Sequence, residues 1–259
     1  MPPINTPPNT PPNTLQRPVA IVTGASSGIG LAIARRLAAD GYDLAICARR
    51  EDKLAKAADM LRRQDINVLS QTVDLRNEAQ ILDFFAAVNA KWGQLDVLIN
   101  NAGLGHKESL MAGKTAAWRE MLEVNVLALC ICTREAISLM QPANSGHILH
   151  VSSMSGHRVP AITGVYSASK FAVRSLTETL RRELRAANSN IRISSVSPGI
   201  VETEFAEKYH QSAEQAEKTY GQFPVLQAVD IANAIAYALS QPEHVEVNDI
   251  LIRPTQQTS

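Results

Sequence analysis

A tyrosine and a lysine stand four positions apart in the stretch GVYSASKFAV, which covers residues 164–173. Four positions make about one turn of an α-helix, so Tyr166 and Lys170 would emerge from the same face. A phenol loses its proton at about pH 10, and a nearby ammonium group favours the phenolate and lowers the pKa of the phenol. The pair is therefore a candidate acid–base group. The alternative is that Tyr166 and Lys170 are functionally unrelated residues on the same helix.

A glycine-rich turn near the start of the chain could hold a phosphate group. The stretch VAIVTGASSGIGLAIARRLA (19–38) has the pattern of a strand, a turn and a helix, and Gly24, Gly28 and Gly30 have the spacing G-x-x-x-G-x-G. Glycines allow a tight turn and a close approach of the backbone to a pyrophosphate, whose charge then faces a helix N-terminus. This arrangement predicts a dinucleotide site in the first βαβ unit.

The end of the second predicted strand indicates which dinucleotide binds. An NAD site usually has an acidic residue there, which accepts hydrogen bonds from the ribose 2′-hydroxyl group. This chain has Ala48 at the corresponding place, followed by Arg49 and Arg50. Guanidinium groups suit a 2′-phosphate, whereas a carboxylate would repel it. We therefore expect NADP(H) as the cofactor, with Arg49 as the main contact to the 2′-phosphate.

Short apolar segments that alternate with longer amphipathic ones must position these groups. The predicted strands are 19–23, 43–48, 68–73, 96–100, 147–152, 191–197 and 249–253. They are mostly apolar without strict alternation, which is typical of strands covered on both faces. The predicted helices are near 28–40, 51–64, 77–91, 115–140, 165–187 and 228–240. This order predicts an α/β fold, a single doubly wound Rossmann domain whose seven-stranded parallel sheet is flanked by helices on both faces.

Two segments stand outside this alternation. Residues 1–16 carry a Pro/Asn/Thr-rich repeat that cannot bury enough apolar surface to order itself, so we expect a flexible tail before a domain of residues 17–259. Residues 200–224 are polar and helix-prone, and they follow the carboxyl end of a strand, where ligands bind in such sheets. We interpret this second segment as a substrate lid, with an ordinary surface excursion as the alternative.

Composition and charge argue against several classes of partner. The 259 residues are 45% hydrophobic, with 25 basic and 25 acidic side chains. This balance gives no indication of nucleic acid or a charged membrane surface as a partner, and no apolar run approaches the roughly 20 residues that insertion into a membrane requires. The three cysteines lie in apolar runs without a CxxC or Cys/His cluster. We therefore expect reduced core thiols in a cytoplasmic protein, and no metal.

Five short motifs follow one another along the chain. They are TGASSGIG, NNAG, SSMSG, YSASK and SPGIVET, which begin at residues 23, 100, 152, 166 and 197. Together they resemble the short-chain dehydrogenase/reductase family over about residues 17–254, and the set is far more specific than any one motif. In that family a tyrosine protonates the carbonyl oxygen while a nicotinamide delivers a hydride to the carbon atom. The resemblance implies this role for Tyr166.

The resemblance also implies roles for the residues around Tyr166. Lys170 should lower the pKa of Tyr166 and bind the nicotinamide ribose, and Ser153 should position and polarise the carbonyl oxygen. Asn125 should hold a water-linked proton relay to the lysine. The catalytic residues implied are Asn125, Ser153, Tyr166 and Lys170. The cofactor-binding residues implied are Gly24, Ser26, Ser27, Gly28, Ile29, Gly30, Arg49, Arg50, Asp74, Leu75, Asn101, Ala102, Gly103, Tyr166, Lys170, Pro198, Gly199, Ile200 and Thr203.

Further family positions concern the two ends of the cofactor. Asp74 resembles the acid that contacts adenine. Asn100 is implied to line the cofactor, with Asp96 bracing the turn beside it. A polar cap at a strand end is the alternative for both acids. The segment from Pro198 to Thr203 should fix the nicotinamide carboxamide.

A closer resemblance implies the reaction. The stretches NVLALCICTREA (125–136), SMSGHRV (153–159), SPGIVETEF (197–205) and IRPTQQ (252–257) are similar to a mammalian subgroup of the family that reduces 17-ketosteroids and α-dicarbonyl compounds with NADPH. The resemblance implies an NADPH-dependent reductase of such a ketone or aldehyde, which works as a homodimer or homotetramer. The alternatives are a 3-hydroxyacid dehydrogenase, a 3-oxoacyl thioester reductase and a catalytically silent NADP(H)-binding sensor.

Overall fold

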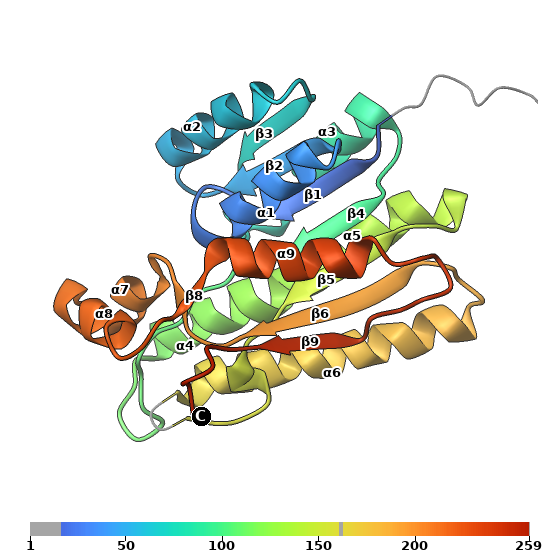
Figure 1. Ribbon diagram of the computed structural model, residues 1–259. Helices are drawn as coiled ribbons and strands as arrows, with labels where there is room; N and C mark the ends of the chain where they lie inside the picture. Colours follow the sequence, from blue (N-terminus) through green and yellow to red (C-terminus); the bar gives the residue numbers. More distant parts are fainter. Residues whose placement is uncertain (1–16, 161–162, 259) are drawn as a thin grey trace, which may run out of the picture.

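The computed structural model describes residues 17–160 and 163–258, so the tail predicted for residues 1–16 lies outside the described residues. Seven strands form one parallel sheet in the order β3-β2-β1-β4-β5-β6-β9 (Figure 1). They are β1 (Val19–Thr23), β2 (Asp43–Ala48), β3 (Val68–Thr72), β4 (Val97–Asn100), β5 (His147–Val151), β6 (Arg192–Pro198) and β9 (Asp249–Ile252). The predicted sheet is confirmed, and each strand agrees with its predicted range to within about one residue at either end.

The strand order reverses at β1. This strand pairs with β2 on one side and with β4 on the other, and the sheet grows outward from both. In a doubly wound sheet the connections after the strands diverge at such a point and leave a crevice at the carboxyl ends. The glycine-rich turn follows β1 and the NNAG turn follows β4, so both lie at this crevice.

Helices cover both faces of the sheet. On one face lie α1 (Gly28–Ala39), α2 (Glu51–Arg62) and α9 (Ala228–Leu239), and on the other lie α3 (Glu78–Trp92), α5 (Ala128–Met140) and α6 (Gly164–Ala186). Side chains of β1 alternate between the two cores, with Ala20 and Val22 in the first and Val19 and Ile21 in the second. Because both faces are covered, the strand is buried at every position, and only its last residue, Thr23, is polar.

The helix expected over residues 115–140 is interrupted. It consists of α4 (Thr115–Leu122), a π-helical segment (Glu123–Leu127) and α5. Asn125 lies in the middle of this wider turn. The apolar periodicity of the stretch continues through the π-helical segment, so the sequence did not predict the interruption. Single π-helical turns inside α-helices are frequent at functional sites because they redirect side chains.

Residues 200–224 fold into a small unit beyond the carboxyl ends of the strands (Figure 1). The unit contains β7 (Val201–Glu202), α7 (Phe205–His210) and α8 (Ala213–Tyr220), and β7 pairs with β8 (Leu226–Gln227), from which the chain enters α9. Across the described ranges 17–160 and 163–258, no helix is long and apolar enough to span a bilayer.

Candidate active site

The glycine-rich turn between β1 and α1 leaves room for a ligand beside the backbone. Gly24 and Gly28 have φ angles of +69° and +55°, which favour glycine. A Cβ on Gly30 would lie 2.4 Å from the carbonyl oxygen of Gly24. Ser27 precedes α1, and its side chain does not cap the helix. The first N–H groups of α1 can therefore receive an anion, and the turn fits the pyrophosphate of a dinucleotide.

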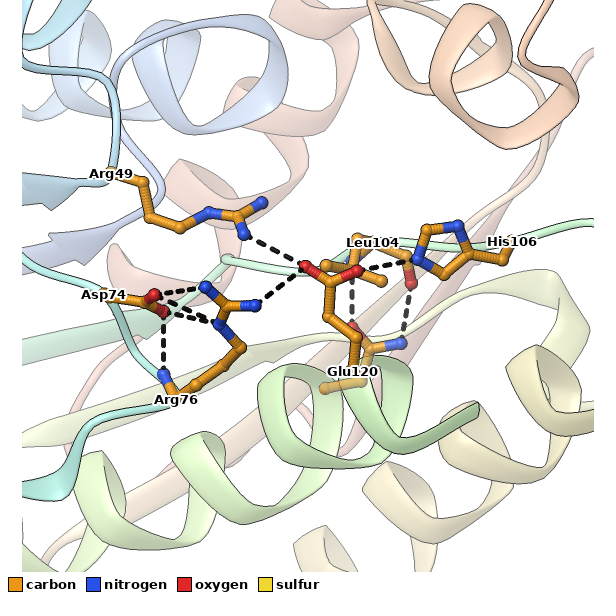
Figure 2. A network of polar contacts seen from close by, with 7 residues as sticks. Arg49, Asp74, Arg76, Leu104, His106 and Glu120 are labelled. Atoms are coloured by element: carbon orange, nitrogen blue, oxygen red, sulfur yellow. Dashed lines mark hydrogen bonds and ion pairs between the residues drawn. The ribbon is translucent and has the colours of Figure 1, made fainter. Parts of the chain in front are cut away.

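The residues expected at the adenosine end are joined by ion pairs (Figure 2). Arg49 Nη1 donates to Glu120 Oε1 at 3.0 Å, and Arg76 Nη1 lies 3.6 Å from the same oxygen. Arg76 also pairs with Asp74 at 2.5 Å, and its hydrogen bonds hold the pKa of Asp74 below the usual value. The expected 2′-phosphate contact and the expected adenine contact are thus connected through Arg76 and Glu120, which the sequence analysis did not single out.

Ser153, Tyr166 and Lys170 meet at the opposite end of the crevice. Ser153 follows β5, while Tyr166 and Lys170 lie one turn apart on α6. Tyr166 is 9% exposed and Lys170 is 5% exposed. The Tyr166 side chain hydrogen-bonds with that of Ser153. Lys170 Nζ donates to the carbonyl oxygen of Val151 at 3.0 Å and lies 6.0 Å from the centre of the Tyr166 ring.

Burial sets the protonation of this pair. Burial raises the pKa of Tyr166 to about 12, and the hydrogen bond with Ser153 offsets only part of that shift. Burial lowers the pKa of Lys170 to about 8. The pKa of Tyr166 was expected to fall beside Lys170, whereas burial raises it, because loss of hydration penalises the charged form of each group. The phenol keeps its proton through the neutral range, as a proton donor must.

Asn125 lies behind the crevice, within the core. Its Oδ1 accepts a hydrogen bond from Leu104 N at 2.9 Å, and its Nδ2 donates to Leu104 O at 2.8 Å and to Ser169 Oγ at 3.0 Å. Its Oδ1 and Lys170 Nζ lie 3.3 and 3.5 Å from the position that a Cβ on Gly103 would take. Asn125 therefore fixes the loop after β4 to α6, and places an amide oxygen on the same side of Gly103 as the lysine.

The segment after β6 is braced by the end of the chain. Gln257 Oε1 accepts a hydrogen bond from Ile200 N at 2.9 Å, and a Cβ on Gly199 would lie 2.3 Å from the same oxygen. Gln257 also lines the crevice. A glutamine near the terminus offered no sequence signal for this position, because its partner lies 57 residues earlier.

Aromatic rings from residues 200–224 pack against the phenol ring of Tyr166. Phe205 and Tyr209 of α7 stack with a centroid distance of 5.8 Å, and their centroids lie 5.5 and 6.1 Å from that of Tyr166. A Cβ on Gly105 would lie between 2.8 and 3.1 Å from atoms of all three rings. The rings thus form an apolar wall against Tyr166, and only a glycine fits where they meet.

A single cavity of about 880 Å³ joins these groups. Its lining includes every member of the cofactor-binding set given above, together with Ser153. Asn125 does not line the cavity and lies in the layer of buried side chains behind it. The sequence motifs, which are scattered over about 180 residues from Gly24 to Thr203, therefore converge on one continuous space. Its volume, its glycine cradle and its cationic rim fit a dinucleotide with a small substrate beside it.

Two further expectations for this region are wrong. Asn100 points away from the cavity, and its Nδ2 donates to the Thr133 hydroxyl group in the core at 2.9 Å. Successive residues of an extended chain face opposite sides, so Asn101 faces the cavity instead. Asp96 precedes β4 and accepts a hydrogen bond from Val19 N at 2.7 Å. It braces the amino end of the sheet, whereas the NNAG turn lies at the carboxyl end of β4.

Known proteins match most of the chain. The short chain dehydrogenase family matches residues 18–214. Dehydrogenase/reductase SDR family member 11 of Gallus gallus is 47% identical over 248 residues, which cover 93% of this chain and 97% of that protein. The Homo sapiens protein of the same name is 44% identical, with coverage of 93% and 95%. The closed form of a serine dehydrogenase complexed with NADP+ has a TM-score of 0.88 at 31% identity, with coverage of 93% and 96%.

Proposed function

This chain belongs to the short-chain dehydrogenase/reductase family, and from that premise we propose that it is an NADPH-dependent carbonyl reductase. The oxidoreductase class, with action on CH–OH groups, follows from the family itself. The observation that carries the proposal is the group formed by the half-buried Ser153 and the buried Tyr166 and Lys170, which shares one cavity with the glycine-rich turn. A hydride and a proton must reach adjacent atoms together, and one cavity that holds both binding regions allows this.

Each side chain of the group has a role in the reduction. When bound, NADPH supplies the hydride that the carbonyl carbon receives. Ser153 and Tyr166 bind the carbonyl oxygen, and the phenol donates its proton as negative charge develops there. The raised pKa of Tyr166, about 12, keeps this proton available at neutral pH. Lys170, whose pKa is about 8, is charged at neutral pH and stabilises the phenolate that the transfer leaves behind.

The charges after β2 support NADP(H) over NAD(H). The strand ends on Ala48, where a carboxylate would repel a 2′-phosphate, and the next two residues, Arg49 and Arg50, line the cavity. Arg76 adds a third guanidinium group at the same end. Glu120, Glu204 and Asp74 pair with these three guanidinium groups, so a 2′-phosphate would compete with the carboxylates for them.

The apolar wall supports an apolar carbonyl substrate. Phe205, Tyr209 and Pro160 line the cavity near Tyr166. A ketosteroid, an α-dicarbonyl compound or a similar ketone or aldehyde would pack against these side chains with its carbonyl group toward the phenol. In this proposal residues 200–224 are the lid over the substrate.

We also propose a cytoplasmic homodimer or homotetramer. The three cysteines are free thiols, as a reducing compartment favours. Leu122, Leu127 and Phe171 are 46%, 56% and 39% exposed, on neighbouring parts of α4, the π-helical segment and α6. This apolar area suits a second copy of the chain.

The test is oxidation of NADPH by the purified protein in the presence of three carbonyl compounds: a 17-ketosteroid, an α-diketone and an acetoacetyl thioester. Turnover of either of the first two supports the carbonyl reductase. Turnover of the thioester alone would assign the chain to 3-oxoacyl chemistry. Tight binding of NADPH without turnover of any of the three would support a sensor and overturn the proposal.

A further inference from the structure

Glu204, the residue before α7, lies among cations at the mouth of the cavity. Its carboxylate accepts hydrogen bonds from Arg50 Nη1 at 2.7 Å and from Lys53 Nζ at 2.5 Å. Lys208, one helical turn later, contacts it at 2.9 Å. Arg50 also donates to Ser27 Oγ of the glycine-rich turn at 2.8 Å. The hydrogen bonds from Lys53 and Lys208, followed by that from Arg50, hold the pKa of Glu204 far below its usual range.

These contacts join distant parts of the sequence across the expected cofactor site. Arg50 and Lys53 lie at the start of α2, about 150 residues before Glu204. The neighbouring Thr203 lies against the glycine-rich turn, since a Cβ on Gly28 would be 3.3 Å from Thr203 Cγ2. Gly28 begins α1, where the pyrophosphate is expected. The bridge from Glu204 to α2 therefore crosses the mouth of the cavity above that position.

The same segment is attached at a second place. Immediately after Glu204, Phe205 packs against the ring of Tyr166, and Tyr209 packs against both. The backbone of Lys107 donates to Tyr209 O at 3.2 Å. One short stretch, residues 203–209, thus contacts the phosphate end through charges and the substrate end through rings. Opening either end without the other would strain this stretch, because only four residues separate Glu204 from Tyr209.

We propose that Glu204 is a positioning residue that fastens residues 200–224 across the bound cofactor, so that this segment retains the cofactor as well as covering the substrate. The inference rests on the proposed NADP(H)-dependent function. It requires that the contacts of Glu204 open before the cofactor can leave. The ion pairs of Glu204 then limit the rate at which the cofactor dissociates.

The charges around Glu204 are compatible with an anionic cofactor beside it. Three cations surround one carboxylate, which leaves positive charge for the phosphate groups. Lys53 is not among the residues that line the cavity, whereas Arg50 is. Replacement of Lys53 therefore weakens the hold on Glu204 without removing a side chain that faces the cofactor.

The test measures the dissociation rate of NADPH by stopped-flow fluorescence in the full-length protein and three variants. Glu204→Gln keeps the size of the side chain and removes its charge, and Lys53→Met removes one partner. Glu207→Gln is the matched control, because Glu207 is exposed on α7 and its carboxylate has no ion pair with any residue of the described chain. We expect dissociation to be about tenfold faster in Glu204→Gln and about threefold faster in Lys53→Met, and unchanged in Glu207→Gln.

A second readout separates a kinetic role from a structural one. If release of the cofactor limits turnover, Glu204→Gln raises kcat, which loss of folding would not do. NADPH that leaves Glu204→Gln and Lys53→Met at the wild-type rate would overturn the inference and leave the proposed function intact. A wild-type protein that does not bind NADPH would overturn the proposed function instead. Should Glu204→Gln fail to fold, Lys53→Met decides the question by itself.

Discussion

The two ends of the cavity hold their charges in opposite ways. At the end where we propose catalysis, Tyr166 and Lys170 are almost completely buried, and loss of hydration shifts both pKa values. At the end where we propose that the 2′-phosphate binds, the side chains of Arg49 and Arg50 are 49% and 34% exposed, and each pairs with a carboxylate. Burial determines the protonation of the side chains at one end. At the other end, the charged side chains are held by ion pairs that stay in contact with water.

This difference determines how much a single substitution costs at each end. Water cannot take the place of a partner that is removed from a buried group, so the full interaction is lost. At an exposed rim, water and salt replace much of what a missing charge supplied. We therefore expect the effects of substitutions to decrease from the Tyr166 end to the Arg49 end, although both ends line the same cavity.

The largest effect is expected for Tyr166→Phe. The change removes the only atom that donates the proton and keeps the ring that packs against Phe205, so kcat should fall by about 10²–10⁴-fold. The dissociation constant of NADPH should stay within about twofold, measured by fluorescence titration. Tyr237→Phe, at a tyrosine 58% exposed on α9, is the control and should leave kcat unchanged. Retention of more than about a tenth of the wild-type kcat would exclude Tyr166 as the donor.

Lys170→Met should change activity and stability in opposite directions. The folded-state pKa of Lys170, about 8, lies below the ordinary 10.5. Between these two pH values the unfolded chain binds more protons, so the free energy of unfolding rises with pH across this window. Below it the buried charge is a full cost to folding. Methionine removes that charge, and we expect the free energy of unfolding at pH 7 to rise by about 1–3 kcal/mol while kcat falls at least about 100-fold.

Denaturant unfolding at two pH values checks the origin of that gain. The gain in stability from Lys170→Met should shrink at about pH 10, where the wild-type lysine has lost its proton. Arg174→Met, on the next turn of α6, is a control for substitution on the same helix; it removes a guanidinium group that donates to Gly156 O at 2.9 Å. A Lys170→Met protein that is less stable than the wild type by the same amount at both pH values would contradict this explanation. It would show that Lys170 stabilises the fold and that burial of its charge has no net cost.

The sequence predicted the parts of this molecule that depend on local pattern. Strands covered on both faces are apolar at consecutive positions, as in β1 and β2, and their ends are marked by turn residues. The helical period placed Tyr166 and Lys170 on one face of α6. The spacing of Gly24, Gly28 and Gly30 predicted the turn that forms. Each of these features requires only neighbours in the chain.

The parts that were missed depend on the tertiary structure. Glu120 pairs with Arg49 across 71 residues, and Glu204 pairs with Arg50 across 154, so no local pattern selects these partners. The spacing of Tyr166 and Lys170 indicates that they are close, but it does not indicate how little water reaches them. The pKa of Tyr166 was therefore expected to fall, and burial raises it. Hydration is a property of the whole fold.

The smallest effect is expected at the exposed end, for Arg49→Ala. Loss of one half-exposed guanidinium group should raise KM for NADPH about tenfold and leave KM for NADH within about twofold, because NADH has no 2′-phosphate. Higher ionic strength should narrow the difference between wild type and variant, since it screens exposed charges, whereas the loss in Tyr166→Phe should not respond to salt. Arg63→Ala, at an exposed arginine after α2, is the control. Equal changes in KM for both cofactors would show that Arg49 does not recognise the 2′-phosphate. A selective rise in KM for NADPH in Arg50→Ala would then assign that role to Arg50, for which the 2′-phosphate would compete with the carboxylate of Glu204.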